Sequence, residues 1–196
     1  MLDNVDFDLI SEAKILHVAG SFIMPGIDGE PTARILKSAK DMGVTTCLDT
    51  VYNGDIDAFS VIEPSLPYLD YFMPSIDEAT LMTKRESPAD IAAFFLDHGV
   101  GTVGLKMGPE GSYIRNSDTE LRIPAFKTNV VDTSGAGDSW IAGFLAGVSM
   151  GWNIEESGRL GSAMGALCAS SIGTTAGLKN LDETIAFMRN AEELSI

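Results

Sequence analysis

The chain has 196 residues, of which 45% are hydrophobic and 21% charged, a composition that suits one globular domain with a buried core. Its net charge of −15 argues against nucleic-acid and anionic-membrane partners. Two cysteines in apolar runs, no basic leader and no long apolar run together predict a cytoplasmic protein without disulfides.

Strand and helix patterns alternate in the first part of the chain. In order they predict a strand, a helix, a second strand, an irregular stretch with short helical pieces, and a third short strand: 15–19, 31–42, 45–49, 53–67 and 71–73. Pro31 suits the first turn of its helix, and Gly43 suits the end of the same helix.

The rest of the chain continues the alternation and ends in helices. The patterns predict two helices, a strand, a hairpin and two further helices: 76–83, 88–97, 102–107, 112–123, 154–171 and one containing Leu181, Ile185 and Met188. Strands that alternate with helices predict an α/β fold with a mostly parallel sheet flanked by helices. Ligands then bind at the carboxyl ends of the strands.

The most informative segment is Val131–Asp138, which reads VDTSGAGD. Apolar residues follow it at helical spacing, from Ile141 to Val148, so a turn with two glycines opens a helix. Glycines let the backbone approach a ligand, and the first turn of a helix offers free N–H groups and the positive end of the dipole. These features predict an anion site suited to phosphate, with Asp138 as a base that takes a proton from an attacking hydroxyl.

A structural interpretation of the same segment is equally open on spacing alone. Asp132, Thr133 and Ser134 are residue types that often cap helices, and the dipole favours an acidic residue such as Asp138 in the first turn. Because three candidate residues or loops lie at or just past strand ends, at Asp49, Glu78 and Gly108, the sequence favours one functional site over simple capping.

Three segments resemble the ribokinase-like (PfkB) carbohydrate kinases, in the order found in that family. Asp132–Asp138 is similar to the family's C-terminal signature, Phe72–Ala79 to its Asn-x-x-Glu segment, and Val103–Gly111 to its nucleotide loop. The resemblance implies a ribokinase-like fold, ATP and Mg²⁺ as cofactors, a sugar substrate, and the single α/β domain 1–196 as the C-terminal part of that fold.

The resemblance also implies roles for individual residues. Asp138 would be the catalytic base, and the amides of Gly135, Ala136 and Gly137 would form the anion hole. Glu78 would help to organise Mg²⁺, and Asp132 would contribute to a site for a monovalent cation such as K⁺.

The nucleotide is expected to contact residues of two segments. Lys106, Gly108 and Gly111 lie in the segment that resembles the nucleotide loop, where Lys106 could instead pack its stem and reach water. Ser75 stands where the family usually has Asn, and its shorter hydroxyl can still hydrogen-bond. Asp49 is a weaker candidate, which could contact an acceptor or cap a turn.

A second departure is that the chain is expected to begin after three N-terminal features of the family: a Gly-Gly sugar-binding motif, an acidic sugar ligand and a small β lid. The fold is therefore expected to be truncated on its N-terminal side, with an exposed sheet edge.

The leading hypothesis is ATP-dependent phosphorylation of a sugar-like hydroxyl. Two alternatives stay open: a catalytically incomplete nucleotide-binding fragment that needs a partner chain or forms a homo-oligomer, and a nucleoside kinase on the same fold. No P-loop lysine motif is present, so the expected phosphate chemistry is not of the Walker type.

Overall fold

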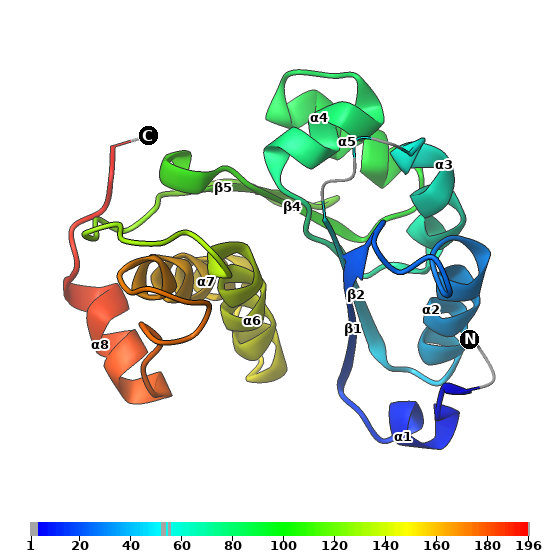
Figure 1. Ribbon diagram of the computed structural model, residues 1–196, viewed down its shortest axis with the longest axis horizontal. Helices are drawn as coiled ribbons and strands as arrows, with labels where there is room; N and C mark the ends of the chain where they lie inside the picture. Colours follow the sequence, from blue (N-terminus) through cyan, green and yellow to red (C-terminus); the bar gives the residue numbers. More distant parts are fainter. Residues whose placement is uncertain (1–3, 52–53, 55, 196) are drawn as a thin grey trace. The chain divides into compact units, whose positions relative to one another are not determined.

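The structure is a computed structural model and describes residues 4–51, 54 and 56–195 (Figure 1). Its residues form two compact units: Met1–Leu105 with Arg115–Glu120, and Lys106–Ile114 with Leu121–Ile196. The organisation as a single domain stays a prediction. Within the described ranges, no helix combines the length and the apolar character that a membrane span requires.

The strands confirm the predicted mostly parallel sheet. In chain order they are β1 (Ile15–Ser21), β2 (Thr45–Thr50), β3 (Tyr71–Phe72), β4 (Thr102–Lys106), β5 (Ser112–Arg115) and β6 (Glu120–Ile123). They form a six-stranded sheet in sequential order, in which the pairs β1–β2, β2–β3 and β3–β4 are parallel. The predicted α/β class with a mostly parallel sheet and flanking helices is therefore confirmed.

The strand boundaries differ from the predicted ones by one or two residues. β1 continues past Gly20 to Ser21 through an irregularity in its pairing with β2. β2 includes Asp49 and ends at Thr50. Both residues are buried, and Thr50 still pairs with Ser21 of β1. A glycine or an acidic residue was therefore a poor marker of a strand end at these positions.

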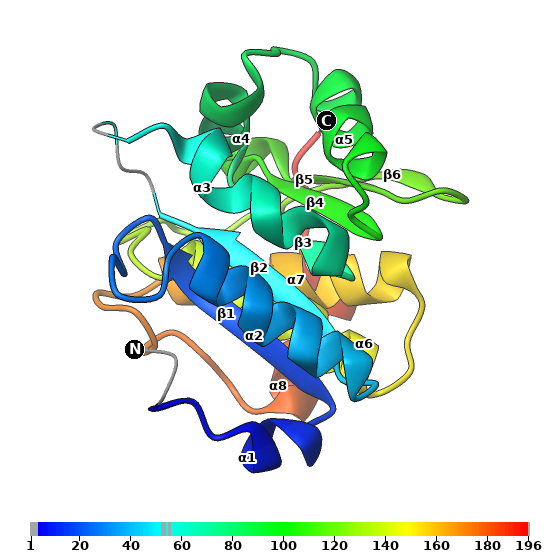
Figure 2. The same cartoon turned by 90° about the vertical axis from the view of Figure 1, so that its right-hand side faces the viewer.

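The first unit contains helices of several lengths in addition to its strands. They are α1 (Phe7–Ser11), α2 (Glu30–Asp41), α3 (Ala58–Ile62), the 3-10 helix η2 (Glu63–Tyr68), α4 (Ile76–Thr83) and α5 (Pro88–Asp97). Figure 2 shows α2 lying across β1 and β2. The bounds of α4 and α5 agree with the predicted ones because Ser75 and Ser87 cap their first turns. The short helix α1 was not predicted; the Asp6 carboxylate caps it by accepting the Leu9 N–H.

The core of the first unit lies where α5 packs onto the strands. Phe72 of β3 and Phe95 of α5 are fully buried, and their ring centroids lie 4.8 Å apart in an edge-to-face arrangement. Leu48 of β2 and Val103 of β4 are also buried. This apolar layer fixes the neighbouring strands whose carboxyl ends carry candidate residues.

The second unit is mainly helical. Besides the 3-10 turn η3 (Gly108–Glu110), it contains α6 (Ala136–Ser149), α7 (Ile154–Ala169) and α8 (Leu181–Asn190), which lie side by side in Figure 1. Glycines bring α6 and α7 into close contact: a Cβ on Gly143 would lie 2.8 Å from the carbonyl oxygen of Leu160. Because α6 packs closely against α7, the position of its first turn is well defined.

Candidate active site

The start of α6 forms as the sequence predicts, with free N–H groups in the first turn. Gly135 is the N-cap residue, in the left-handed region at φ 75°, and no side chain caps the helix. The first bond along the helix runs from the Ser139 N–H to the Gly135 carbonyl, so the N–H groups of Gly137 and Asp138 precede it. Asp132, Thr133 and Ser134 therefore do not act as side-chain caps of α6, which removes the main support for the purely structural interpretation.

The Ala136 amide differs from its neighbours. Its N–H donates to the Thr133 carbonyl at 3.1 Å and closes a tight turn before the helix. Of the three amides assigned to the anion hole, this one already has a protein acceptor. The expected role of Ala136 therefore needs either a shared hydrogen bond or a change in this turn on binding.

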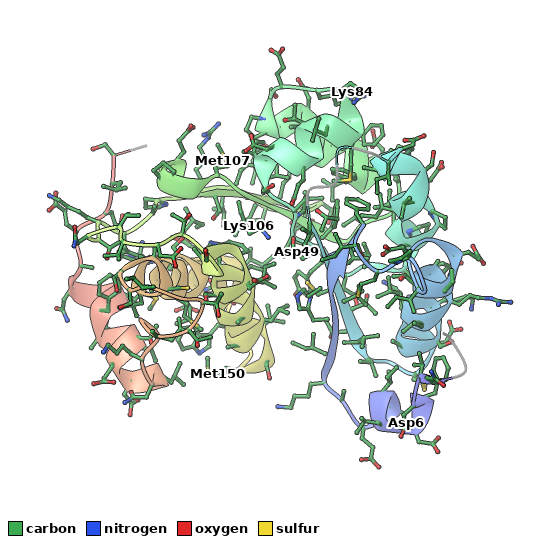
Figure 3. All side chains as sticks on the ribbon, viewed as in Figure 1. Asp6, Asp49, Lys84, Lys106, Met107 and Met150 are labelled. Atoms are coloured by element: carbon green, nitrogen blue, oxygen red, sulfur yellow. The ribbon has the colours of Figure 1, made fainter. Side chains whose placement is uncertain are left out.

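Asp138 and Lys106 belong to the same unit and flank this first turn. Asp138 is exposed, so a substrate hydroxyl can reach its carboxylate. Lys106 ends β4 and is half-buried, and a Cβ built on Gly137 would lie 3.6 Å from the Lys106 Nζ (Figure 3). The structure thus brings a cation to the positive end of a helix, and the two together favour an anionic ligand.

The Asp132 carboxylate links the turn before α6 to the loop after α7. Its Oδ1 accepts the Ser134 N–H and its Oδ2 accepts the Gly173 N–H, both at 2.9 Å. The Gly173 bond, followed by the bonds from Ser134, lowers the pKa of Asp132 from its usual value. The carboxylate is therefore charged at neutral pH and acts as a fixed clamp between two loops.

Cys168 adds a second link between these loops. Its thiol is fully buried and donates to the carbonyl oxygens of Thr174 at 3.1 Å and Ser134 at 3.5 Å. A Cβ on Gly135 would lie 2.8 Å from the Cβ of Thr174, so only glycine fits where the loops meet. The geometry of the anion-hole turn therefore depends on the loop that follows α7.

The loop of Gly108 and Gly111 is a tight turn after β4. The Met107 N–H donates to the Gly111 carbonyl at 2.8 Å, and the Gly111 N–H donates to that of Gly108 at 3.1 Å. Gly111 has a φ of 82°, and its Cβ would lie 2.0 Å from the carbonyl oxygen of Ile123. Backbone crowding therefore explains Gly111, whereas Gly108 is exposed and meets nothing within 4 Å.

In the first unit, the structure brings Ser75 and Glu78 together with Thr50. Ser75 is the N-cap of α4: its hydroxyl accepts the Glu78 N–H at 3.3 Å, and its own N–H donates to the Glu78 Oε2 at 2.9 Å. The Thr50 hydroxyl donates to the same Oε2 at 3.0 Å. Glu78 is thus held by a residue at the carboxyl end of β2 and by the turn after β3.

Two further features involve β2 and Glu78. Asp49 is 4% exposed and lies within β2 beside Thr50, near the strand's end in Figure 3. Glu78 lines an open pocket of about 160 Å³, together with Phe22, Asp57 and Lys84 among others. The pocket has room for several water molecules, each of which occupies roughly 30 Å³ in the liquid.

The acidic side chains fit a hydrated metal better than an all-protein metal site. In the part of the chain that the structure describes, no three His, Cys, Asp or Glu side chains gather as metal ligands. Mg²⁺ typically keeps several waters and uses one or two carboxylates together with substrate phosphates. Glu78, a carboxylate beside a pocket that admits water, therefore fits a role toward Mg²⁺.

Three residues of these clusters were not singled out by sequence reasoning: Thr50, Cys168 and Gly173. Thr50 had a signal, since it directly follows Asp49 at a strand end. Cys168 and Gly173 had none, because no spacing rule links a helix end to a turn more than 30 residues before it. Only the folded chain shows that they hold the Asp132 turn.

Comparison with known protein families shows the family to which the chain belongs. Residues 1–181 match the family described as pfkB family carbohydrate kinase. The chain belongs to this family. The predicted resemblance is therefore confirmed, and the family is one of kinases.

Among characterised and uncharacterised relatives, two illustrate the range. The chain is 28% identical over 191 residues to an ATP-dependent 6-phosphofructokinase of Thermoanaerobacterium thermosaccharolyticum, covering 95% of this chain and 59% of that protein. It is 30% identical over 177 residues to an uncharacterised sugar kinase of Archaeoglobus fulgidus, covering 90% of this chain and 69% of that protein.

Solved structures confirm the ribokinase-like fold. A ribokinase from Thermotoga maritima matches with a TM-score of 0.81 and 27% identity, over 97% of this chain and 61% of that one. A putative ribokinase II from E. coli, solved with ATP and Mg²⁺, matches with a TM-score of 0.81 and 22% identity, over 96% of this chain and 62% of that one. The chain thus spans about three fifths of several relatives that it matches.

Proposed function

We propose that this protein is an ATP-dependent phosphotransferase that acts on a sugar-like hydroxyl. The observation that carries the proposal is the first turn of α6, where uncapped N–H groups, the Lys106 ammonium and the exposed Asp138 carboxylate occur together. Donors and a cation suit a phosphate, whereas a carboxylate beside them suits proton transfer.

Asp138 accepts the proton of the attacking hydroxyl in this proposal. The amides of the Gly135–Gly137 turn, and the Asp138 N–H behind it, donate to the oxygens of the transferred phosphoryl group as charge builds up on them. Of these, the Ala136 amide must be shared with the Thr133 carbonyl. Lys106 adds a positive charge at the same position, and Gly108 lets the nucleotide lie close to the backbone.

The proposal includes two cations. Mg²⁺, when bound, supplies positive charge that neutralises the phosphates. Glu78 would hold its water shell, and Ser75 would hold Glu78. A monovalent cation such as K⁺ fits the Asp132 turn, because this carboxylate is charged and held in place by hydrogen bonds from Ser134 and Gly173.

The acceptor is proposed only as a sugar-like alcohol. Because the chain spans about three fifths of the relatives, a complementing chain or a second copy is part of the proposal for full activity. The relatives include kinases with different acceptors, among them ribokinase and 2-dehydro-3-deoxygluconokinase.

Two variants test the base and the anion site separately. Asp138→Asn should leave the calorimetric affinity for ATP–Mg²⁺ close to that of the wild type, since the amides remain. Its phosphoryl transfer to a panel of sugars should fall by about 10²–10⁴-fold, the usual effect of a positioned base. Gly137→Val should abolish ATP binding, because its side chain fills the space in front of Lys106.

Wild-type turnover by Asp138→Asn would refute the base assignment. A folded wild-type chain that binds no ATP–Mg²⁺ would refute the nucleotide site itself. If ATP binds but no sugar is phosphorylated, the incomplete-fragment alternative gains support over the complete kinase.

A further inference from the structure

The Glu78 carboxylate receives two hydrogen bonds on one and the same oxygen. Its Oε2 accepts the Ser75 N–H at 2.9 Å and the Thr50 hydroxyl at 3.0 Å. Among the described residues, none donates a hydrogen bond to its Oε1. One oxygen is therefore used to hold the carboxylate, and the other remains for water or a ligand.

The Ser75 N–H and the Thr50 hydroxyl have different structural roles. The Ser75 bond belongs to the capping box of α4, which forms wherever Ser or Thr precedes Glu by three residues at a helix start. The Thr50 bond is not local: it joins residues 28 positions apart and ties the helix to the carboxyl end of β2. A capping box therefore explains the first bond fully and leaves the second without a role in capping.

Thr50 is well suited to fix an orientation. It is 3% exposed and ends a strand that is almost entirely buried, so its backbone has little freedom. Its branched side chain also restricts the first side-chain torsion, which holds the hydroxyl in place. Two donors that reach one oxygen from different elements prevent the carboxylate from turning about its last bond.

We propose that Thr50 is a positioning residue, which acts through Glu78 to hold that carboxylate's second oxygen toward the waters of Mg²⁺. The proposal rests on the proposed function, in which Glu78 serves Mg²⁺. Residues that orient a metal's ligands in this way typically contribute about 10–100-fold to metal affinity. Thr50 touches neither substrate nor metal.

The test measures how strongly Mg²⁺ strengthens ATP binding to the intact chain. Calorimetry gives the ATP affinity with Mg²⁺ and with EDTA, and the ratio of the two is the coupling between metal and nucleotide. Thr50→Val keeps the shape and removes the hydroxyl, and should lower this ratio by about tenfold. Thr50→Ser keeps the hydroxyl and should preserve the wild-type ratio.

Thr46→Val is the matched control. Thr46 lies in the same strand, is fully buried, and donates its hydroxyl to the Tyr68 carbonyl at 2.6 Å, away from Glu78. The Thr46→Val variant should have a lower melting temperature and an unchanged ratio of ATP affinities with Mg²⁺ and with EDTA. If Thr50→Val does not fold, Thr50→Cys replaces it, because a thiol is a weaker donor and should give a smaller decrease.

An unchanged ratio in folded Thr50→Val or in its replacement Thr50→Cys, or an equal decrease in Thr46→Val, would overturn the inference and leave the nucleotide site intact. A wild-type chain that binds ATP equally well with Mg²⁺ and with EDTA would overturn the role of Glu78 and the inference together. A wild-type chain that binds no ATP would instead overturn the proposed function, on which the inference rests.

Discussion

At the residue scale, single carboxylates in this protein hold two chain segments together through hydrogen bonds. Asp132 accepts one N–H on each oxygen, from Ser134 and from Gly173, and Glu78 accepts two donors on one oxygen. Asp138 differs because it is exposed at the start of α6. Thus Asp132 and Glu78 are each fixed by hydrogen bonds within their own unit, while Asp138, the acid proposed to react, is accessible.

The Asp132 clamp should be sensitive to acid. Its folded-state pKa lies below the usual value of 3.8, so its contribution is complete above pH 3.8 and is lost as pH falls through the lower, folded value. Hydrogen exchange at the Gly173 amide should stay slow. Its rate, corrected for the intrinsic effect of pH, should remain constant from pH 8 to about pH 5. In Asp132→Asn, the same amide or that of Ser134 should exchange faster at every pH, since a neutral amide offers one acceptor atom.

Asp182→Asn provides a control, because it neutralises an acid in the first turn of α8, outside these loops. Exchange rates at both the Gly173 and the Ser134 amide that are equal in the wild type and in Asp132→Asn would contradict the clamp.

At the element scale, the packing of α6 against α7 depends on missing side chains. A Cβ on Gly143 would lie 2.8 Å from the Leu160 carbonyl oxygen, and one on Gly161 would lie 2.7 Å from that of Trp140. Backbone atoms cannot move aside as side-chain ends do. The two helices therefore approach closely only because these positions are glycine.

Gly143→Ala should lower the free energy of unfolding by up to about 2 kcal/mol, because overpacking typically costs about 1–3 kcal/mol. The gain in helix propensity, about 1 kcal/mol, is smaller than the upper part of that cost. Gly165→Ala is the comparison, because its Cβ would meet the Ala136 carbonyl oxygen at 3.3 Å and the helices need give way only slightly. Urea denaturation measures both. Equal stability changes in the two variants would show that the close approach of the helices does not determine the cost of a side chain at position 143.

At the scale of the whole molecule, β1 is the terminal strand of the sheet in the described residues, and the chain carries a large net charge. β1 stands at the end of the strand order, so in the described part of the chain only its β2 side pairs with a strand. An unpaired strand edge promotes association with another strand. The net charge of −15 opposes association between copies, and salt screens this repulsion.

Sedimentation of the 196-residue chain should therefore show association that increases with concentration and with salt. Ala19→Lys, at an exposed position of β1, should reduce it, because charged residues on an edge discourage pairing. Leu9→Lys changes the charge equally at a position of α1 that is 67% exposed and should have less effect. A wild-type chain that remains monomeric at all salt concentrations would count against association through β1.

The sequence by itself determined the features that depend on neighbouring residues. The bounds of α4 and α5 follow from Ser75 and Ser87, and the glycine turn before Asp138 follows from adjacent residues. The parallel α/β class also followed, because strand and helix periods alternate along the chain.

Only the tertiary structure decided which distant groups meet. It joined Thr50 to Glu78 and Asp132 to Gly173. Such bonds depend on where the packed core places strand ends and loops. Periodicity and spacing carry no information on these positions, so the bonds appear only once the chain is folded.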